Sequence, residues 1–373
     1  AWQKEKSQCA AILNSIVGWR LAEDAQRGSH FLDKSLHLAS LSRQSLDACI
    51  ETVRQHKELG ERIFTLQARR LGREFLAPWD WYAPAPLKDG TNSLSFMEAV
   101  KLVESSFSTF SPAMGEFVSM MVEQKWIDCR VLENKSAMPF CSYFPRAKEP
   151  RVSVPFTGTA KNLQTLAHEL GHAYHYWVLR NLPLARRRMP MPIAEAAGIF
   201  TQNAMSEVLL EESTGNERLT LLWEMCAQIR TFLFHDLCFF DFEYELYERR
   251  AAGPLSGDEV SEMFGKHWRK WFGNHYGPDE DRWLRTVFPF MTGKRFYNYP
   301  YAIGFLFALA LQDKRKKEKS FSRFYDGLLA DSGSMPLEEL AHKHLAVDLH
   351  KPQFWSTALD FATTIVERFE EAL

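Results

Sequence analysis

The chain has 373 residues, of which 46% are hydrophobic and 13% aromatic, so it can bury a large core in one big domain or in two that share a cleft. Lys and Arg total 45 against 47 for Asp and Glu, so no excess charge favours nucleic acid or an anionic membrane surface as a partner. The six cysteines are widely spaced and form no CxxC pair, which is typical of reduced thiols in a cytoplasmic protein.

Helical periodicity dominates the sequence from its N-terminal part onward. Leu46, Ile50 and Val53 recur at spacings of three and four residues, as expected for one buried face of a helix. The Pro- and Trp-rich segment 77–90 interrupts this pattern, because each Pro disfavours helix at its own and the preceding position. We expect a mainly α protein with an N-terminal helical arm and linker over 1–90 and a catalytic domain over 91–373, or one continuous fold.

The middle of the chain carries the few strand signals. Helices are expected over 95–123, and the segments 136–144 and 151–156 read as two strands of one small sheet. From residue 162 helix dominates to the end, and the longest apolar stretch, near 303–311, is too short to span a bilayer. No basic and apolar leader resembles a signal peptide.

One motif on a predicted helix carries chemistry. Asn162 is a plausible N-cap, and on the helix that follows His168 and His172 are four residues apart, so their imidazoles can take neighbouring positions of a tetrahedral zinc ion. Glu169 then lies where it can reach the zinc-bound water without being a ligand, as in an HExxH peptidase. The alternative of two surface histidines is disfavoured by the apolar residues around the motif.

A third protein ligand must come from elsewhere in the chain. The metzincin spacing would place it at Val178, which excludes that class. Glu195, on a predicted helix over 191–210, is the favoured candidate, and Glu207 is its rival. His175, one turn beyond His172, is read as a supporting or packing residue.

At these residues the sequence resembles a known family. "TLAHELGHAYH" followed by "AEAAGIF" is similar to zinc peptidases of the thimet oligopeptidase and oligoendopeptidase F family, closest to the oligoendopeptidase F branch. "WIDC", "FYNYPYAIGF" and "LAVDLHKPQFW" agree with it. The resemblance implies a gluzincin-type HExxH domain whose helices line a deep channel, one zinc ion bound by His168, His172 and Glu195, and Glu169 as the general base. Members are usually longer at the N-terminus, so we expect much of the N-terminal lobe to be missing here.

Two positions depart from the family pattern. Gln202 stands where members usually carry a supporting acidic residue, and Phe288 stands where a His helps to stabilise the tetrahedral intermediate; Phe has no hydrogen-bond donor. The resemblance points to Tyr297, Tyr299 and Tyr301 as substrate-facing residues that could supply a phenol, although aromatic core is an equally good interpretation. His275 could replace the missing imidazole, but the sequence offers no geometry for that role.

These residues predict a zinc-dependent endopeptidase that hydrolyses short unstructured peptides. We expect neither nucleic acid nor a membrane as a partner, and the sequence allows either a monomer or an oligomer. The second hypothesis is a zinc-binding pseudopeptidase that holds peptides or a partner with little cleavage. A third is zinc-dependent hydrolysis of a non-peptide amide. The segment 151–156 could offer a sheet edge to the substrate backbone or could be an interior strand. The basic run 186–188 is read as a solvated loop.

Overall fold

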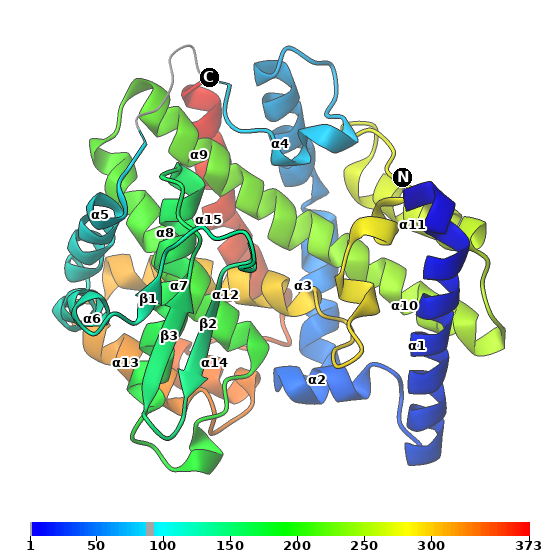
Figure 1. Ribbon diagram of the computed structural model, residues 1–373, viewed down its shortest axis with the longest axis horizontal. Coiled ribbons are helices and arrows are strands. Elements are labelled where there is room, and N and C mark those ends of the chain that lie inside the picture. Colours follow the sequence, from blue (N-terminus) through cyan, green and yellow to red (C-terminus); the bar gives the residue numbers. More distant parts are fainter. Residues whose placement is uncertain (1, 87–92) are drawn as a thin grey trace. The chain divides into compact units, whose positions relative to one another are not determined.

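The protein, described here by a computed structural model over residues 2–86 and 93–373, consists mainly of α-helices (Figure 1). Its α-helices are α1 Lys6–Arg27, α2 Asp33–Ala39, α3 Arg43–Gln55, α4 Lys57–Arg70, α5 Phe96–Ser108, α6 Pro112–Glu123, α7 Ala160–Leu179, α8 Met191–Glu212, α9 Gly215–Ile229, α10 Asp236–Ala252, α11 Gly257–Phe272, α12 Tyr299–Lys317, α13 Phe321–Asp331, α14 Leu337–Leu345 and α15 Pro352–Glu371. The strands are β1 Ile127–Asp128, β2 Phe140–Phe144 and β3 Glu149–Ser153. The predicted mainly α class with one small sheet is confirmed.

The chain divides into two compact units. The first consists of Ala1–Ala83 and Ala227–Ala302, and the second of Pro84–Cys226 and Ile303–Leu373. The first unit thus combines the predicted N-terminal arm with a segment that the sequence places inside the catalytic domain. The division of the chain at residue 90 stays a prediction.

The first unit has an aromatic core between helices that are distant in sequence. Phe64 of α4 lies 5.2 Å from Phe272 of α11 and 5.9 Å from Phe234, measured between ring centroids. Arg295 forms a buried two-bond ion pair with Asp24 of α1. These contacts tie residues 227–302 to the N-terminal helices, and ion pairs of this kind are costly to break because each buried charge would lose its partner.

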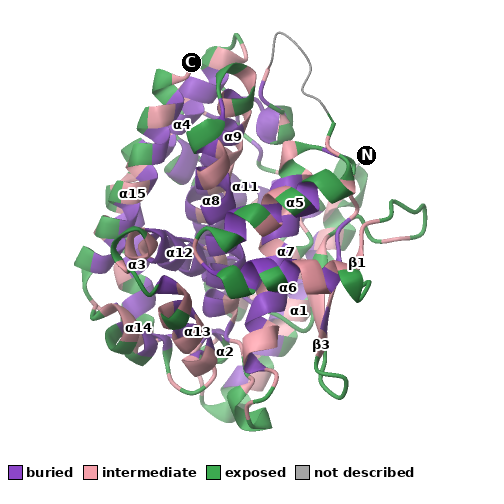
Figure 2. Cartoon of the chain, turned by 90° about the vertical axis from the view of Figure 1, so that its left-hand side faces the viewer, coloured by how far each residue is buried: buried purple, intermediate pink, exposed green. Residues whose placement is uncertain are grey.

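The second unit is organised around the contact between α7 and α8. Helix α8 is buried along most of its length, as Figure 2 shows, and its buried side chains include polar ones such as Glu195 and Gln202. The sheet packs on α7: Tyr143 of β2 is stacked on Tyr176 of α7, with ring centroids 4.9 Å apart. This arrangement places the HExxH helix between a sheet and a second, largely buried helix.

The strand order in the sheet is β1-β3-β2. Strand β3 pairs in parallel with β1 and antiparallel with β2, with Val152 opposite both Ile127 and Cys141. The segment predicted over 151–156 therefore supplies the central strand, and its interpretation as a sheet edge is wrong. Strand β2 is the long edge strand, and β1, which sequence patterning missed, has only two residues.

Helix α7 begins earlier than its predicted N-cap. The Thr159 hydroxyl caps the helix by accepting a hydrogen bond from the backbone N–H of Asn162. The Asn162 side chain instead accepts from the backbone N–H of Thr157. Both residue types can cap, so the sequence alone does not decide between them.

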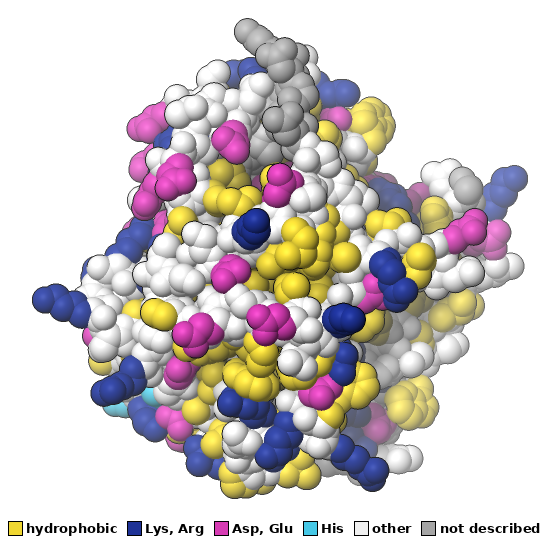
Figure 3. Space-filling view, turned by 60° about the vertical axis from the view of Figure 1, so that its left-hand side comes forward, with side chains coloured by type: hydrophobic (Ala, Val, Ile, Leu, Met, Phe, Trp, Pro, Cys, Tyr) yellow, Lys and Arg dark blue, Asp and Glu magenta, His cyan; other side chains and the backbone are white. Residues whose placement is uncertain are grey.

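The surface carries charges of both signs, in line with the balanced composition. Figure 3 shows acidic and basic side chains interspersed on one face, with hydrophobic side chains between them. In the second unit, exposed hydrophobic residues lie on and around β2, namely Val131, Leu132, Met138, Phe140 and Phe144. Within the described part of the chain, no helix is both long and apolar enough to cross a membrane.

Candidate active site

The crossing of α7 and α8 brings His168, His172 and Glu195 together. One ligand atom from each lies within 4.8 Å of the others. Nε2 of His168 is 3.5 Å, and Nε2 of His172 is 3.8 Å, from Oε2 of Glu195. Ligands bonded to zinc at their usual lengths in a tetrahedron stand about 3.4 Å apart. The three side chains therefore fit a zinc ion, and all three come from rigid helices.

Helical geometry explains how the two imidazoles meet. Four residues separate His168 from His172, so both project from one face of α7, with ring centroids 4.6 Å apart and planes at 87°. The His168 ring is pressed against α8 at Gly198, where a Cβ atom would come within 2.8 Å of its Nε2. A larger residue at Gly198 would push the ring away from Glu195.

Helix α12 supports the third ligand from behind. A Cβ atom at Gly304 would lie 2.7 Å from the carbonyl oxygen of Pro192 and 2.9 Å from Cβ of Glu195. Glycine at this position lets the helix approach α8 closely, and Glu195 is 8% exposed. Close packing of α12 against α8 thus holds the backbone that carries the Glu195 carboxylate in place.

Burial and neighbouring charges set the protonation of the histidines. Burial, and after it the charge of the neighbouring His168, lower the pKa of His172 to about 4, which favours the neutral form that can ligate. Burial also acts to lower the pKa of His168, but the hydrogen bond to Glu195 and the charges of Glu169 and Glu195 raise it overall. A carboxylate in contact with both rings is the arrangement expected where a cation is to replace protons.

Glu169 is a buried carboxyl group beside the three candidate ligands. Its pKa is raised to about 7, mainly by burial; the charge of His168 acts to lower it and that of Glu195 acts to raise it. A bound cation would oppose this shift and favour the carboxylate. Its side chain is 6% exposed and interacts with Cys141 of β2. A carboxyl group with a raised pKa beside candidate metal ligands is the kind of group found at functional sites.

Three other side chains named from the sequence lie in the same unit. Oε1 of Gln202 is 3.2 Å from Nδ1 of His168, so Gln202 contacts the ring on the side away from Glu195. His175 is buried and hydrogen-bonded through Nε2 to the Ser332 hydroxyl at 2.8 Å. Glu207 forms ion pairs with Arg315 and Lys316, which accounts for its burial without a metal.

The three tyrosines belong to the first unit. Tyr299 is fully buried and its hydroxyl accepts a hydrogen bond from Ser35 at 3.1 Å, as expected of a core residue. Tyr297 and Tyr301 are half-buried, and their hydroxyl oxygens are 3.1 Å apart. The Phe288 ring lies 5.2 Å from that of Tyr297. A catalytic role for any of the tyrosines stays a prediction.

His275 also lies in the first unit, where its Nδ1 is 3.2 Å from the Thr65 hydroxyl and its Nε2 is 4.0 Å from Glu61. Those contacts are with side chains of α4. They supply no support for a catalytic imidazole at this position.

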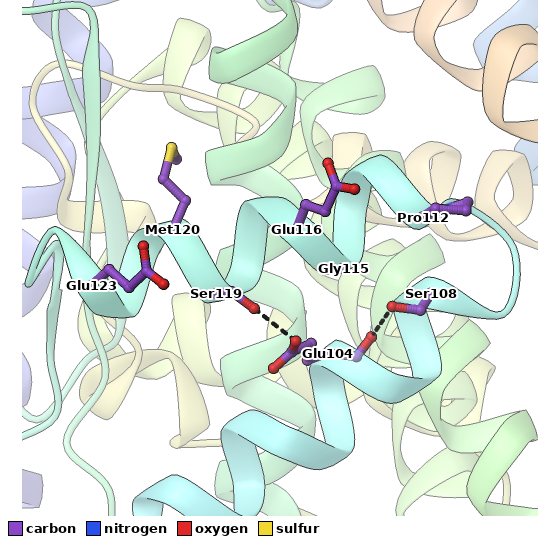
Figure 4. A pocket seen from close by; sticks show the side chains of 8 residues that line it. All are labelled: Glu104, Ser108, Pro112, Gly115, Glu116, Ser119, Met120 and Glu123. Atoms are coloured by element: carbon purple, nitrogen blue, oxygen red, sulfur yellow. Dashed lines mark hydrogen bonds between the residues drawn. The ribbon is translucent and has the colours of Figure 1, made fainter.

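A pocket of about 370 Å³ lies between α5 and α6 and is distinct from the metal group (Figure 4). Glu104, Glu116 and Glu123 are among its lining residues, and the Ser119 hydroxyl donates to Glu104 at 2.7 Å. None of its lining residues is a His or Cys. It therefore offers carboxylates but none of the imidazole nitrogens that the three-residue group on α7 and α8 provides.

Comparison with known proteins agrees with this arrangement. Residues 1–361 match peptidase family M3, and the chain belongs to that family. The predicted resemblance to oligoendopeptidase F is confirmed. Oligopeptidase PepF of Bacillus subtilis is 25% identical over 354 residues, which cover 91% of this chain and 52% of the relative. An oligoendopeptidase F homolog of Lactococcus lactis is 26% identical over 335 residues, covering 87% and 54%.

Solved structures share the fold. Oligoendopeptidase-F from Enterococcus faecium superposes with a TM-score of 0.71 at 20% identity and covers 100% of this chain and 61% of that one. A structure of PZ peptidase A with an inhibitor gives a TM-score of 0.81 at 18% identity, covering 98% and 66%. The chain spans about half the length of the curated relatives it matches.

Proposed function

We propose that the protein is a zinc-dependent endopeptidase that hydrolyses short, unstructured peptides. The observation that carries this proposal is the convergence of His168, His172 and Glu195 within 4.8 Å, with the buried carboxyl group of Glu169 beside them. Membership of peptidase family M3 supports peptide hydrolysis as the reaction. The names of the relatives, oligopeptidase and oligoendopeptidase, support short peptides as the substrate class.

In this proposal the two imidazoles and the Glu195 carboxylate hold one zinc ion. A bound zinc ion supplies a Lewis acid that polarises the scissile carbonyl and lowers the pKa of its water. Glu169 takes the proton of the attacking water and then passes it to the leaving amine. Burial of Glu169 keeps competing water away from this proton, so that transfer to the amine is favoured.

The edge of the sheet offers a place for the peptide backbone. The N–H groups of Val152 and Val154 in and after β3 donate toward β1, to the carbonyls of Trp126 and Asp128. In an antiparallel ladder the backbone groups of successive residues point to opposite sides, so Cys141 and Tyr143 of β2 direct theirs away from β3. An extended peptide that pairs with this edge would run alongside Glu169, which interacts with Cys141.

The decisive variant for the mechanism is Glu169→Gln, which keeps the shape of the side chain and removes the base. With zinc bound, we expect unchanged metal content and the loss of cleavage of an internally quenched peptide. Glu116→Gln, an exposed position on α6, is the matched control and should cleave like the wild type. Cleavage retained by Glu169→Gln would contradict the assigned role.

A second candidate is a zinc-binding pseudopeptidase that holds peptides or a partner protein with little cleavage. One observation favours it, because Phe288 presents a ring to Tyr297 where the family resemblance leads us to expect an imidazole. Loss of one donor to the developing oxyanion costs about 10²–10³-fold in turnover. In the same assay this candidate would bind zinc and peptide without measurable cleavage.

We also propose a reducing, cytoplasmic setting. All six cysteines are free, and Cys49, Cys226 and Cys238 are buried in the core. An oxidising compartment would favour pairing of cysteines in a secreted chain.

A further inference from the structure

The Gln202 side chain contacts the candidate ligand His168 at Nδ1, the ring nitrogen that does not face Glu195. It lies two turns beyond Glu195 on the same face of α8, and its Oε1 is 3.2 Å from Nδ1 of His168. The side chain is 9% exposed. An outer partner of this kind fixes which ring nitrogen of a ligating His carries the proton.

The orientation of the Gln202 amide follows from a chain of hydrogen bonds that starts at a backbone carbonyl. The Ser206 hydroxyl lies 2.9 Å from the carbonyl oxygen of Gln202, and because a carbonyl only accepts, the hydroxyl donates. The Ser206 hydroxyl oxygen can then only accept from other groups, and it accepts a hydrogen bond from the Nε2 amide group of Gln164 at 3.3 Å.

The orientations of the Gln164 and Gln202 side-chain amides follow in the same way. With Nε2 of Gln164 directed at Ser206, its Oε1 faces Gln202 and accepts Nε2 of that residue at 3.4 Å. Oε1 of Gln202 is then the atom that faces His168 and accepts from Nδ1. Gln164 and Ser206 are 2% and 0% exposed, so solvent does not compete for these groups.

The tautomer of His168 is the end point of this relay. Nδ1 keeps its proton because it donates to Oε1 of Gln202, so Nε2, which faces Glu195 and the candidate metal position, is the nitrogen that can give up its proton and ligate. A flipped Gln202 amide would present N–H to Nδ1 and force the proton onto Nε2, where it would block ligation. The relay therefore makes Nε2, and not Nδ1, the free nitrogen of His168 whenever the ring is neutral.

We propose that Gln202, Gln164 and Ser206 form a neutral amide relay that holds His168 in its zinc-binding tautomer and limits the zinc affinity of the site. The inference rests on the proposed function, since it concerns the same metal site. The three candidate ligands contribute one negative charge, and an amide at 202 adds none, so the cation is compensated less than it would be with a carboxylate there. Gln202 is in this account a positioning residue.

The test uses zinc alone as the probe, in competition with a chromophoric chelator. Outer partners of metal ligands typically change affinity by about 10–100-fold. We expect Gln202→Glu to tighten zinc binding and Gln202→Leu to weaken it, each by about that factor. Gln164→Leu should weaken binding less, because the Gln202 amide keeps its contact with His168 but is free to flip.

Gln312→Leu is the matched control. Gln312 is a fully buried glutamine that donates to the carbonyl oxygen of Phe200 on α8, and it has no bond to the relay. The zinc affinity of this variant should equal that of the wild type. Unfolding of each variant in the absence of metal shows whether the fold is retained.

A second readout reports the tautomer directly. Nitrogen-15 spectra of the metal-free protein, recorded at a pH where the His168 ring is neutral, should show the proton on Nδ1 in the wild type and in Gln202→Glu, and a mixture of tautomers in Gln202→Leu. Equal zinc affinities and equal tautomers in all three proteins would overturn the relay while the proposed function stands. A wild-type protein that binds no zinc would overturn the proposed function, and the tautomer measurement would still decide the relay.

Discussion

Nε2 of His168 and Oε2 of Glu195 lie 3.5 Å apart across the contact of α7 and α8. This separation supports Glu195 as the proposed third ligand, whereas its rival Glu207 forms ion pairs with Arg315 and Lys316. We expect Glu195→Gln to weaken zinc binding by more than about 100-fold, beyond what an outer partner contributes, and to abolish cleavage. Zinc competition and a quenched-peptide assay measure both effects.

Glu207→Gln is the companion variant. It should keep wild-type zinc affinity but lower the free energy of unfolding by about 1–3 kcal/mol, because Arg315 loses a buried charged partner. The reverse pattern, with zinc lost in Glu207→Gln and kept in Glu195→Gln, would exchange the two roles.

The edge strand leads to a prediction about substrates. Suppose that the peptide backbone pairs with Cys141 and Tyr143 of β2. Methylating a substrate amide nitrogen that donates to this strand should then remove one backbone hydrogen bond and add a steric clash. We expect N-methylation at one residue beside the cleaved bond to raise KM strongly, and N-methylation at the next residue, which points away, to have little effect. A uniform response along the peptide would argue against pairing with β2.

Phe288→His tests what the departure from the family pattern costs. A single donor to the developing oxyanion is worth about 10²–10³-fold in turnover, and we expect the variant to recover at least about tenfold in kcat. The neighbouring Phe290→His, whose ring is stacked on Trp283, is the control and should not gain activity. No gain at either position would mean that another group already fills this role or that the chemistry does not need it.

A pH dependence is expected in the first unit. Burial raises the pKa of Glu243 from its ordinary 4.5 to about 7, although the backbone N–H of Phe296 and the charges of Arg20 and Arg295 lower it. The folded state therefore holds this proton more tightly than the unfolded state. The resulting stability is complete below the unfolded pKa and is lost as the pH rises through about 7.

Glu243→Gln isolates this contribution, because the amide can still accept from the Phe296 N–H, which lies 2.8 Å from Oε1 of Glu243. In urea titrations between about pH 5 and about pH 8, the stability of the wild type should fall relative to that of the variant. Parallel curves for the two proteins would show that Glu243 keeps an ordinary pKa.

Local sequence spacing was enough to predict the features that depend on one helix. The spacing of His168, Glu169 and His172 places them on one helix, and Glu195 is the favoured candidate on a second predicted helix before the resemblance agrees with it. Such features need only helical geometry. The true N-cap, Thr159, differed from the predicted one because two capping residues stand three positions apart.

Features that join distant segments could not be predicted in the same way. Asp24 and Arg295 meet across 271 positions, and their pairing draws a late segment into the first unit. Strand β1 escaped detection because two residues show no alternation. Gln164 and Ser206 did carry a weak signal, since each stands one turn from a named residue, His168 or Gln202, but the polarity of their hydrogen bonds appears only when α7 and α8 pack.

The most direct test of the account is zinc-dependent cleavage by the wild-type protein. Treatment with a chelator, followed by removal of the chelator and addition of one equivalent of zinc, should abolish and then restore cleavage of a quenched peptide, with one zinc ion bound per chain. Cleavage that persists in the metal-free protein, or a protein that takes up no zinc, would contradict it.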